Sequence, residues 1–357
     1  YPDEPFDCHG VYSGSALIEG TEMYLYYTGN VKHPGDYDYI KQGRGHNVCL
    51  AVSHDGKTVA SKQCLLYNKD YPAGLTCHVR DPKVFAYEGK YYMVLGARTL
   101  EDKGEVLVLE STDKLHWNHI NTITTPAAFG YMWECPDLFC LDGQWYLAVS
   151  PQGIQCQNVY GCGYFTVYGD WRTSCTLGEF HEMDFGFDYY APQSFVDNTG
   201  RRIQIGWMGM PDADYGNAPT VAHGWQHCFT VPRLLTKGEN GTLLQSPVPE
   251  LAAQHGPARK LANGAEASIS PCFDLTAAPA GDFALTVAHD VELVYTEQDS
   301  TCVLRFTDAS MADGRTERRA KLSAPCRSVR VVGDRSSLEI FLNEGAAGFS
   351  TRYYPAP

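Results

Sequence analysis

Hydrophobic and polar residues alternate along most of this chain in short runs that turn residues interrupt. Four segments share one plan, a glycine in a tight turn followed by a run rich in β-branched and aromatic residues: EGTEMYLYYTGN (19–30), YEGKYYMVLGA (87–97), LDGQWYLAVSP (141–151) and NTGRRIQIGWMG (198–209). Such runs predict β-strands joined by hairpin turns. Patterns of long amphipathic helices are almost absent, so the chain is predicted to be all-β.

The turn glycines of these segments follow one another at separations of 54 to 69 residues. Each turn is preceded by another strand-like run, such as KVFAY or PQSFVD, and further runs of this kind follow, such as NVCLAVS and EVLVLES. A repeat of about 55–60 residues with about four strands is typical of propeller blades. We therefore predict a β-propeller over residues 1–245. The pattern alone also allows an array of β-sandwiches that does not close into a ring.

The composition changes after the predicted propeller. The stretch LLQSPVPELAAQHGPARKLANG (243–264) contains three prolines, at positions 247, 249 and 257, and predicts a linker over residues 246–264. Short strand-like runs follow it, such as SVRVVGD and SSLEIFLNEG. They predict a C-terminal β-sandwich over residues 265–357.

The stretch GYMWECPDLF (130–139) sets two carboxylates, Glu134 and Asp137, among apolar residues. An unpaired buried carboxylate is costly, so a surface role does not explain Glu134 well. A carboxylic acid in apolar surroundings can keep its proton near neutral pH and protonate a leaving group. Glu134 is therefore a candidate general acid.

A second carboxylate, Asp81 in VRDPKVF (79–85), lies 53 residues before Glu134, which is about one repeat. The innermost strands of a propeller line its central cavity, so we expect Asp81 and Glu134 to face the same cavity. An Asp before Pro can instead simply cap a turn. Arg80 can be a surface cation, or it can bind a sugar hydroxyl and keep Asp81 ionised.

The composition narrows the classes of function. The chain has 28 Lys and Arg against 42 Asp and Glu, a formal net charge of −14, which argues against nucleic acid as a partner. No apolar run is long enough to predict a membrane-spanning helix, so we expect no membrane partner. The 13 cysteines form no CxxC pair, which predicts reduced, mostly buried thiols in a cytoplasmic protein and no metal site.

Eight motifs carry a resemblance to a known family: YSGSA, YTGN, RDPKVF, WECPDLF, SPQG, FDYYAPQSF, GRRIQIGWMG and SLEIFLNEG. In this order, over essentially the whole chain, they resemble glycoside hydrolase family 32, the β-fructofuranosidases, which include invertases, sucrose-6-phosphate hydrolases and fructan hydrolases. The resemblance implies an all-β chain with a five-bladed β-propeller, of which four blades are present here, and a C-terminal β-sandwich.

The resemblance also implies roles for particular residues. Glu134 corresponds to the family's general acid/base, and Asp81 to the carboxylate that stabilises the transition state by gripping fructose hydroxyls. The implied substrate contacts are Arg80, Ser13, Tyr12, Cys135 and Trp207, with Tyr12 in place of the more usual Phe. The implied reaction is hydrolysis of a terminal β-D-fructofuranoside with retention of configuration, which needs no metal or organic cofactor.

The chain departs from the family at the nucleophile. The family places this Asp in a motif like NDPNG in the first blade, and no such motif occurs in the sequence. Asp3 and Asp7 lie too close to the YSGSA motif to replace it. We therefore expect that the natural protein begins upstream, that the first blade is absent from this sequence, and that the chain is inactive without the missing Asp.

The partner is predicted to be a small sugar: sucrose, sucrose 6-phosphate or a short fructo-oligosaccharide. A phosphorylated substrate would need a nearby cation, for which Lys32, Lys41 and Arg44 are candidates, although a solvated loop explains these residues better. The sequence leaves open a fructosyltransferase and a non-catalytic fructoside-binding propeller. The WECPD and YSGSA motifs argue against an inverting arabinanase-type enzyme. The oligomeric state is not predicted.

Overall fold

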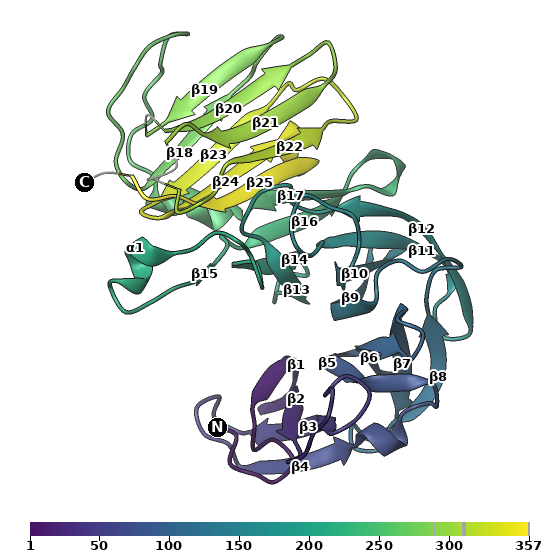
Figure 1. Cartoon of the computed structure of the whole chain (residues 1–357). Coiled ribbons are helices and arrows are strands. Elements are labelled where there is room, and N and C mark those ends of the chain that lie inside the picture. Colours follow the sequence, from purple (N-terminus) through teal and green to yellow (C-terminus); the bar gives the residue numbers. More distant parts are fainter. Residues whose placement is uncertain (289, 309–311, 356–357) are drawn as a thin grey trace. The chain divides into compact units, whose positions relative to one another are not determined.

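The computed structural model describes residues 1–288, 290–308 and 312–355, which form an all-β chain of antiparallel sheets (Figure 1). It divides into two compact units. Unit 1 contains Tyr1–Gln155 and Gly163–His181, and unit 2 contains Cys156–Cys162 and Glu182–Pro357. The predicted all-β architecture of propeller blades and a C-terminal sandwich is confirmed.

Unit 1 contains three four-stranded sheets, each in the up-and-down order of a propeller blade. The first blade consists of β1 (Val11–Glu19), β2 (Glu22–Lys32), β3 (Arg44–Ser53) and β4 (Ser61–Leu66), and the short 3₁₀ turn η1 (Asn68–Asp70) follows it. The second consists of β5 (Leu75–Tyr87), β6 (Lys90–Thr99), β7 (Gly104–Ser111) and β8 (Asn118–Ile123). The third consists of β9 (Met132–Leu141), β10 (Gln144–Gln152), β11 (Gly163–Asp170) and β12 (Ser174–Glu182).

The hairpin turns form where the glycines predict them. Gly20, Gly89, Gly143 and Gly200 have φ angles of 62°, 79°, 77° and 87°, and each lies between the first two strands of a blade. These angles are in the left-handed region, where a side chain is strained. The repeated glycine in the sequence is therefore a repeated turn in the structure.

The blades of unit 1 pack face to face through two hydrophobic clusters. Met93 and Leu95 of β6 pack in one cluster with residues of the first blade, such as Leu50. Tyr92 and Val94, on the opposite face of the same strand, pack in the other cluster with the third blade. Because successive residues of a strand point to opposite faces, β6 is buried on both sides. This explains why its sequence is a continuous apolar run.

One close contact brings the second and third blades together. A Cβ atom on Gly96 would lie 1.9 Å from the carbonyl oxygen of Trp133, and one on Gly104 would lie 2.4 Å from Cδ1 of the Trp133 ring. Trp133 is fully buried, and its indole N–H donates to the carbonyl oxygen of Phe129 at 2.7 Å. Two glycines in the second blade therefore make room for the start of β9.

Unit 2 contains the fourth blade and the C-terminal sandwich. The blade consists of β13 (Tyr190–Val196), β14 (Arg202–Met208), β16 (Arg233–Lys237) and β17 (Leu243–Pro247). A short strand, β15 (Cys228–Phe229), pairs with β14. This part of the chain also has three short helical turns, α1 (Ala218–Val221), η2 (Glu239–Gly241) and η3 (Pro249–Gln254). One sandwich sheet has β18 (Phe273–Ala277), β23 (Val329–Asp334), β24 (Ser337–Leu342) and β25 (Ala347–Arg352), with η5 (Asn343–Gly345) before β25. The other has β19 (Phe283–Val287), β20 (Val291–Thr296), β21 (Thr301–Phe306) and β22 (Glu317–Lys321).

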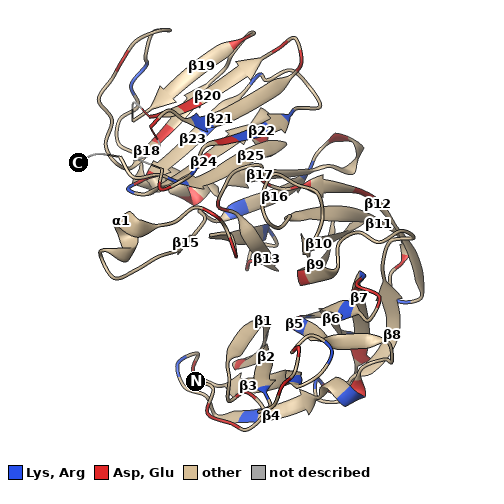
Figure 2. Ribbon diagram, in the orientation of Figure 1, with Lys and Arg blue, Asp and Glu red and all other residues tan. Residues whose placement is uncertain are grey.

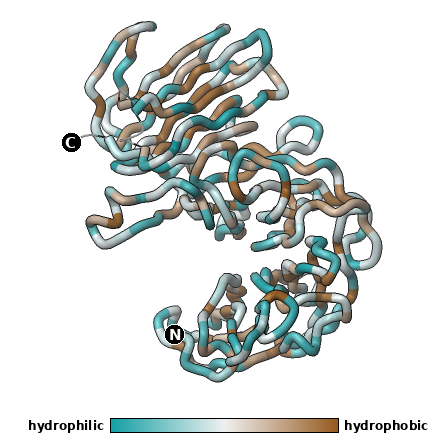
Figure 3. Tube along the Cα trace, viewed as in Figure 1, coloured by the Kyte–Doolittle hydropathy of each residue, from teal (hydrophilic) through white to brown (hydrophobic). Residues whose placement is uncertain are grey.

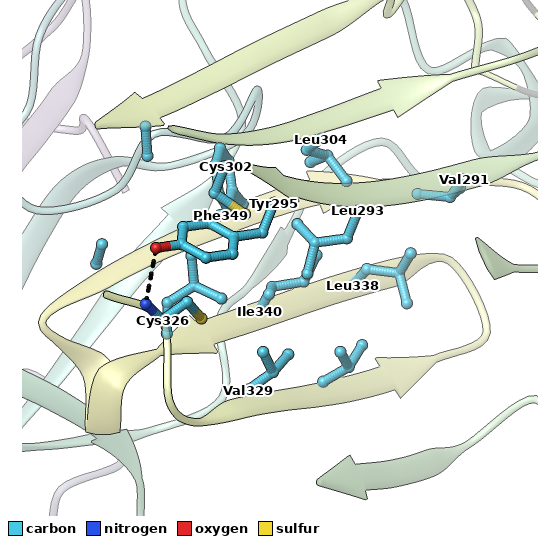
Figure 4. Packing of buried hydrophobic residues seen from close by; sticks show 14 of the residues in the cluster. Val291, Leu293, Tyr295, Cys302, Leu304, Cys326, Val329, Leu338, Ile340 and Phe349 are labelled. Atoms are coloured by element: carbon cyan, nitrogen blue, oxygen red, sulfur yellow. Dashed lines mark hydrogen bonds between the residues drawn. The ribbon is translucent and has the colours of Figure 1, made fainter. Parts of the chain in front are cut away.

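The sandwich has its own hydrophobic core. Leu293 and Leu304 from one sheet point toward Ile340 and Phe349 from the other (Figure 4). The hydroxyl oxygen of Tyr295 accepts the backbone N–H of Cys326 at 3.1 Å, so the buried phenol has a partner. Hydrophobic and hydrophilic positions alternate along these strands (Figure 3), as a sheet with one buried face requires.

A buried ion network joins the fourth blade to the sandwich within unit 2. Arg233 of β16 is 1% exposed, and its guanidinium lies 2.7 Å from Glu339 of β24 and 3.2 Å from Asp184. It also donates to the hydroxyl of Ser350 in β25. The boundary predicted from the sequence at residues 246–264 stays a prediction.

The surface and the cysteines are ordinary for a globular chain. Charged residues are interspersed with uncharged ones along the strands of both units (Figure 2). All 13 cysteines are free thiols. Within the described ranges, no helix is long and apolar enough to cross a membrane.

The contact between Gly96 and Trp133 gives a testable prediction. The change Gly96→Ala should lower the free energy of unfolding by about 1–3 kcal/mol, because the added methyl group overlaps a backbone carbonyl. Urea denaturation followed by tryptophan fluorescence measures the effect. Gly256→Ala is the matched control, since nothing lies within 4 Å of a Cβ at that position. An unchanged unfolding midpoint in Gly96→Ala would show that β9 can move away freely.

Candidate active site

The innermost strand of every blade is irregular at the same place. The pairing of this strand with its neighbour shifts register within one short stretch of each blade, next to the four motifs VYSGSA, VRDPKVF, WECPDLF and YYAPQSF. The shifts fall between Tyr12 and Gly14 in β1, between Arg80 and Lys83 in β5, opposite Glu134 and Asp137 in β9, and between Tyr190 and Gln193 in β13. Such bulges redirect side chains and are common next to active sites.

Three of these bulges contain a residue in the left-handed region. Asp81, Cys135 and Ala191 have φ angles of 65°, 47° and 50°, and each precedes a proline. This conformation is uncommon for residues other than glycine, and it is found at sites where the backbone is held for function. When the blades are aligned on the left-handed residues of their bulges, Asp81 corresponds to Cys135 and Arg80 corresponds to Glu134. The spacing of about one repeat pairs Asp81 with Glu134 instead, and this pairing is wrong by one residue.

Arg80 and Glu134 meet across the second and third blades. The Arg80 guanidinium donates two hydrogen bonds to Oε1 of Glu134, from Nη2 at 2.5 Å and from Nε at 3.0 Å. The other carboxylate oxygen, Oε2, accepts a hydrogen bond from Nε2 of Gln152 in β10 at 3.0 Å. Both oxygens of Glu134 are therefore held, and the side chain keeps 16% of its surface exposed.

Asp81 is buried beside this pair. Its Oδ2 accepts the backbone N–H of Cys135 at 2.9 Å and lies 3.9 Å from Nε of Arg80. Its own backbone N–H donates to the hydroxyl of Thr28 at 2.9 Å. Burial raises the pKa of Asp81 to about 6, the charge of Arg80 opposes this rise, and the charge of Glu134 adds to it. Asp81 is consequently ionised at neutral pH at some cost in stability.

His78 completes the surroundings of Arg80. Nη1 of Arg80 lies 2.6 Å from Nδ1 of His78, and the ring of His78 lies 5.3 Å from that of His46 in an edge-to-face arrangement. Burial, followed by the charge of Arg80, lowers the pKa of His78 to about 3. Burial also lowers the pKa of His46, so both imidazoles are neutral, and Arg80 is the cation shared by the two carboxylates.

The other residues expected at the site are placed as follows. Ser13 and Tyr12 are exposed in β1, and the ring of Tyr12 lies 5.7 Å from that of His46. Cys135 is buried, with its Sγ 3.5 Å from Asp81. Trp207 belongs to unit 2, where its ring lies 4.7 Å from that of His227.

Several residues of the site were not singled out from the sequence. Gln152 belongs to the SPQG motif quoted above. This motif ends the strand that forms a hairpin with the WECPDLF strand, and that pairing was the signal that could have found Gln152. Ser15 of YSGSA accepts the backbone N–H of Val84 at 2.9 Å and donates to the carbonyl oxygen of Pro82 at 2.8 Å, which fixes β1 against β5. Thr28 belongs to the quoted YTGN motif, whereas His78 lies in none of the quoted motifs and gave no signal.

Asp3 and Asp7, which were not assigned as nucleophiles, form ion pairs with Lys62. The ammonium group of Lys62 contacts Asp3 and lies 2.7 Å from Oδ2 of Asp7. Asp7 is fully buried and also accepts the hydroxyl of Tyr27 at 2.7 Å. These contacts give both residues a structural explanation.

An all-β chain of propeller blades that presents two carboxylates around one buried arginine has the features of a glycosidase. The model of the glycosyl hydrolases family 32 N-terminal domain matches residues 1–247, and that of the family 32 C terminal matches residues 235–357. The chain therefore belongs to glycoside hydrolase family 32 and is a glycosidase.

Curated relatives and solved structures agree with this assignment. The chain is 38% identical to a sucrose-6-phosphate hydrolase of Bacillus subtilis, over 100% of this chain and 76% of the relative, and 31% identical to a raffinose invertase of Escherichia coli, over 99% and 76%. The structure of a sucrose-6-phosphate hydrolase from Lactobacillus gasseri superposes with a TM-score of 0.85 at 25% identity, covering 99% of this chain and 76% of that one. A β-fructofuranosidase of Bombyx mori has the same fold, with a TM-score of 0.76 at 24% identity over 96% and 74%.

The raised pKa of Asp81 predicts a pH-dependent stability. Its pKa is about 6 in the folded chain against an ordinary value of 3.8 for Asp, so the folded state binds the proton more tightly and loses stability as pH rises through this interval. Asp81→Asn should therefore raise the free energy of unfolding at pH 7.5 by about 1–3 kcal/mol, and the gain should shrink toward pH 4.

Denaturation curves at several pH values measure this effect. Asp36→Asn, at an exposed position, is the matched control and should leave stability unchanged at each pH. A destabilised Asp81→Asn protein at pH 7.5 would mean that the ionised carboxylate is stabilising, contrary to the argument from burial.

Proposed function

We propose that the site around Glu134 and Asp81 serves the hydrolysis of terminal β-D-fructofuranosides with retention of configuration; the expected inactivity of this chain without a further Asp stays a prediction. The observation that carries the proposal is the pair of carboxylates, Glu134 and Asp81, that share the buried Arg80. Sucrose, sucrose 6-phosphate and short fructo-oligosaccharides are the candidate substrates, because relatives with 31–38% identity are named sucrose-6-phosphate hydrolases and a raffinose invertase. A retaining reaction proceeds in two steps through a covalent fructosyl intermediate.

Glu134 is proposed as the general acid and base. In the first step a carboxylate attacks the anomeric carbon of the fructosyl unit while Glu134 gives its proton to the leaving glycosidic oxygen. In the second step Glu134 takes a proton from water, whose oxygen attacks the anomeric carbon and releases fructose together with the carboxylate. Arg80 and Gln152 orient the two oxygens of Glu134 for both transfers. The attacking carboxylate is not assigned to a residue.

Asp81 is proposed to stabilise the transition state. It is ionised at neutral pH, and it is held by the N–H of Cys135 and by the left-handed turn of its own backbone. A fixed carboxylate can accept hydrogen bonds from two sugar hydroxyls, and these bonds strengthen as positive charge develops on the ring. The residues of unit 1 proposed to contact the substrate are Tyr12, Ser13, Arg80 and Cys135, and the substrate contact expected for Trp207 stays a prediction.

A cytoplasmic location is proposed as well. Its support is the state of the 13 cysteines, all free thiols in the structure, since disulfides are rare where thiols are kept reduced. A phosphorylated sugar as substrate would agree with such a location.

The role of Glu134 can be tested with the substitution Glu134→Gln. Hydrolysis of sucrose or sucrose 6-phosphate should fall by about 10²–10⁴-fold in kcat, because an amide cannot donate the proton. The loss should be much smaller in the first step for a 4-nitrophenyl fructoside, whose leaving group needs no protonation. Burst kinetics separate the two steps.

Glu101→Gln, at an exposed position, serves as the control and should retain full activity. Equal losses of the first step for the natural and the activated substrate would argue that Glu134 acts in binding rather than in proton transfer.

A further inference from the structure

Two cysteines of the first blade face each other across neighbouring strands. Cys49 of β3 is paired with Cys64 of β4 in the antiparallel register, next to a shift of that register. Directly opposed residues of antiparallel strands have Cα atoms about 4.5–5.5 Å apart and side chains on the same face. A disulfide requires Cα atoms about 4.4–6.8 Å apart. The backbone therefore holds these two thiols at a spacing that a disulfide can bridge.

The two thiols differ in their access to solvent. Val48 and Leu50 of β3 pack toward the second blade, whereas Cys49 between them lies on the other face, in a small cluster with Cys64. Cys49 is 0% exposed, and a Cβ atom on Gly29 of β2 would lie 2.7 Å from its Sγ. Cys64 is half-buried. A small reagent from solvent therefore meets Cys64 first, with Cys49 behind it.

Hydrogen bonds make Cys64 the more reactive thiol. The Cys49 thiol donates to the sulfur of Cys64, which lowers the pKa of Cys64 below its ordinary value and raises the pKa of Cys49. Burial of Cys64 opposes this lowering, and a second donor, the hydroxyl of Tyr67, supports it. The same bond raises the pKa of Tyr67. Because the thiolate is the nucleophilic form of cysteine, Cys64 is placed to attack and Cys49 to follow.

Other cysteines lack this combination of contact and access. Cys302 and Cys326 belong to the same hydrophobic core of the sandwich, but both are 0% exposed, and burial raises the pKa of each. Cys8 and Cys140 are exposed and serve as internal references for the reactivity of a surface thiol.

We propose that Cys64 and Cys49 form an oxidant-reactive thiol pair that closes reversibly into a disulfide between β3 and β4. The inference does not depend on the proposed function. Disulfides in reducing compartments are usually transient, which agrees with thiols that are free in the structure. Closure also protects Cys64, because a disulfide is reduced by other thiols, whereas a sulfenic acid without a partner is oxidised further to a sulfinic acid.

The reaction balances with hydrogen peroxide as the oxidant. The Cys64 thiolate attacks one oxygen of the peroxide, the O–O bond breaks, and the departing hydroxide takes up the proton that Cys64 released. The product is a sulfenic acid at Cys64. The sulfur of Cys49 then attacks the sulfur of Cys64, the S–O bond breaks, and the hydroxyl group leaves as water with the proton of Cys49. Two thiols are oxidised to one disulfide, and one peroxide is reduced to two waters.

Peptide mapping of the reduced chain after treatment with a stoichiometric amount of hydrogen peroxide tests the inference. Trypsin places Cys49 and Cys64 in separate peptides, residues 45–57 and 63–69, each with a single cysteine. Free thiols are first blocked with N-ethylmaleimide. Mass spectrometry without reduction should then show these two peptides linked, and dithiothreitol should separate them.

Variants test the role of each group. Cys49→Ala should leave a sulfenic acid at Cys64 that dimedone traps, whereas Cys64→Ala should leave Cys49 unmodified, because Cys49 is buried. Tyr67→Phe should slow the reaction of Cys64 with peroxide by about 2–10-fold, since it removes one hydrogen bond to the thiolate. Tyr168→Phe, at an exposed tyrosine of the third blade, is the matched control and should leave this rate unchanged.

The inference is wrong if peroxide leaves the peptides 45–57 and 63–69 unlinked, whether or not Cys8 and Cys140 react. It is also wrong if Cys64 links to a cysteine other than Cys49. If dimedone labels Cys49 in Cys64→Ala as readily as it labels Cys64 in Cys49→Ala, the order of attack is overturned.

Discussion

A regular β-strand cannot present two consecutive residues to the same place, because its side chains alternate between faces. The site nevertheless uses consecutive residues on two strands, Arg80 with Asp81 and Glu134 with Cys135. The bulges in β5 and β9 resolve this conflict, because the second residue of each pair, Asp81 or Cys135, lies in the left-handed region and its side chain is redirected. Every contact between Asp81, Arg80 and Glu134 depends on this local break in the ladder.

Charge balance is the second constraint. One guanidinium faces two carboxylates and an imidazole, so Arg80 cannot neutralise its surroundings completely. Asp81 shows the effect of this incomplete neutralisation. Burial raises its pKa although the cation Arg80 lies beside it. Groups that are tuned for chemistry often destabilise the fold that holds them. In unit 1 the hydrophobic faces of the blades offset this destabilisation.

The sequence was sufficient to predict the strands, the turns and the blades. Hydrophobic alternation and the glycines at the hairpins are local signals, and the structure confirms them at Gly20, Gly89 and Gly143. The spacing of 53 residues could not show which residues are equivalent, because a bulge changes the register by one without changing the sequence pattern. Gln152 and Thr28 are defined by partners on other strands, Glu134 and Asp81, and such contacts exist only after the sheets have formed.

The network around Arg233 has a consequence for the history of this protein. The two family models divide the sequence near residues 235–247, as if a propeller and a sandwich had simply been joined. In unit 2, however, an arginine of the fourth blade is neutralised by Glu339 and bound by Ser350, both in the sandwich. A gene rearrangement that removed the sandwich would leave this cation with Asp184 but without Glu339 and Ser350. The sandwich therefore contributes to the integrity of the fourth blade, whether or not it contacts a sugar.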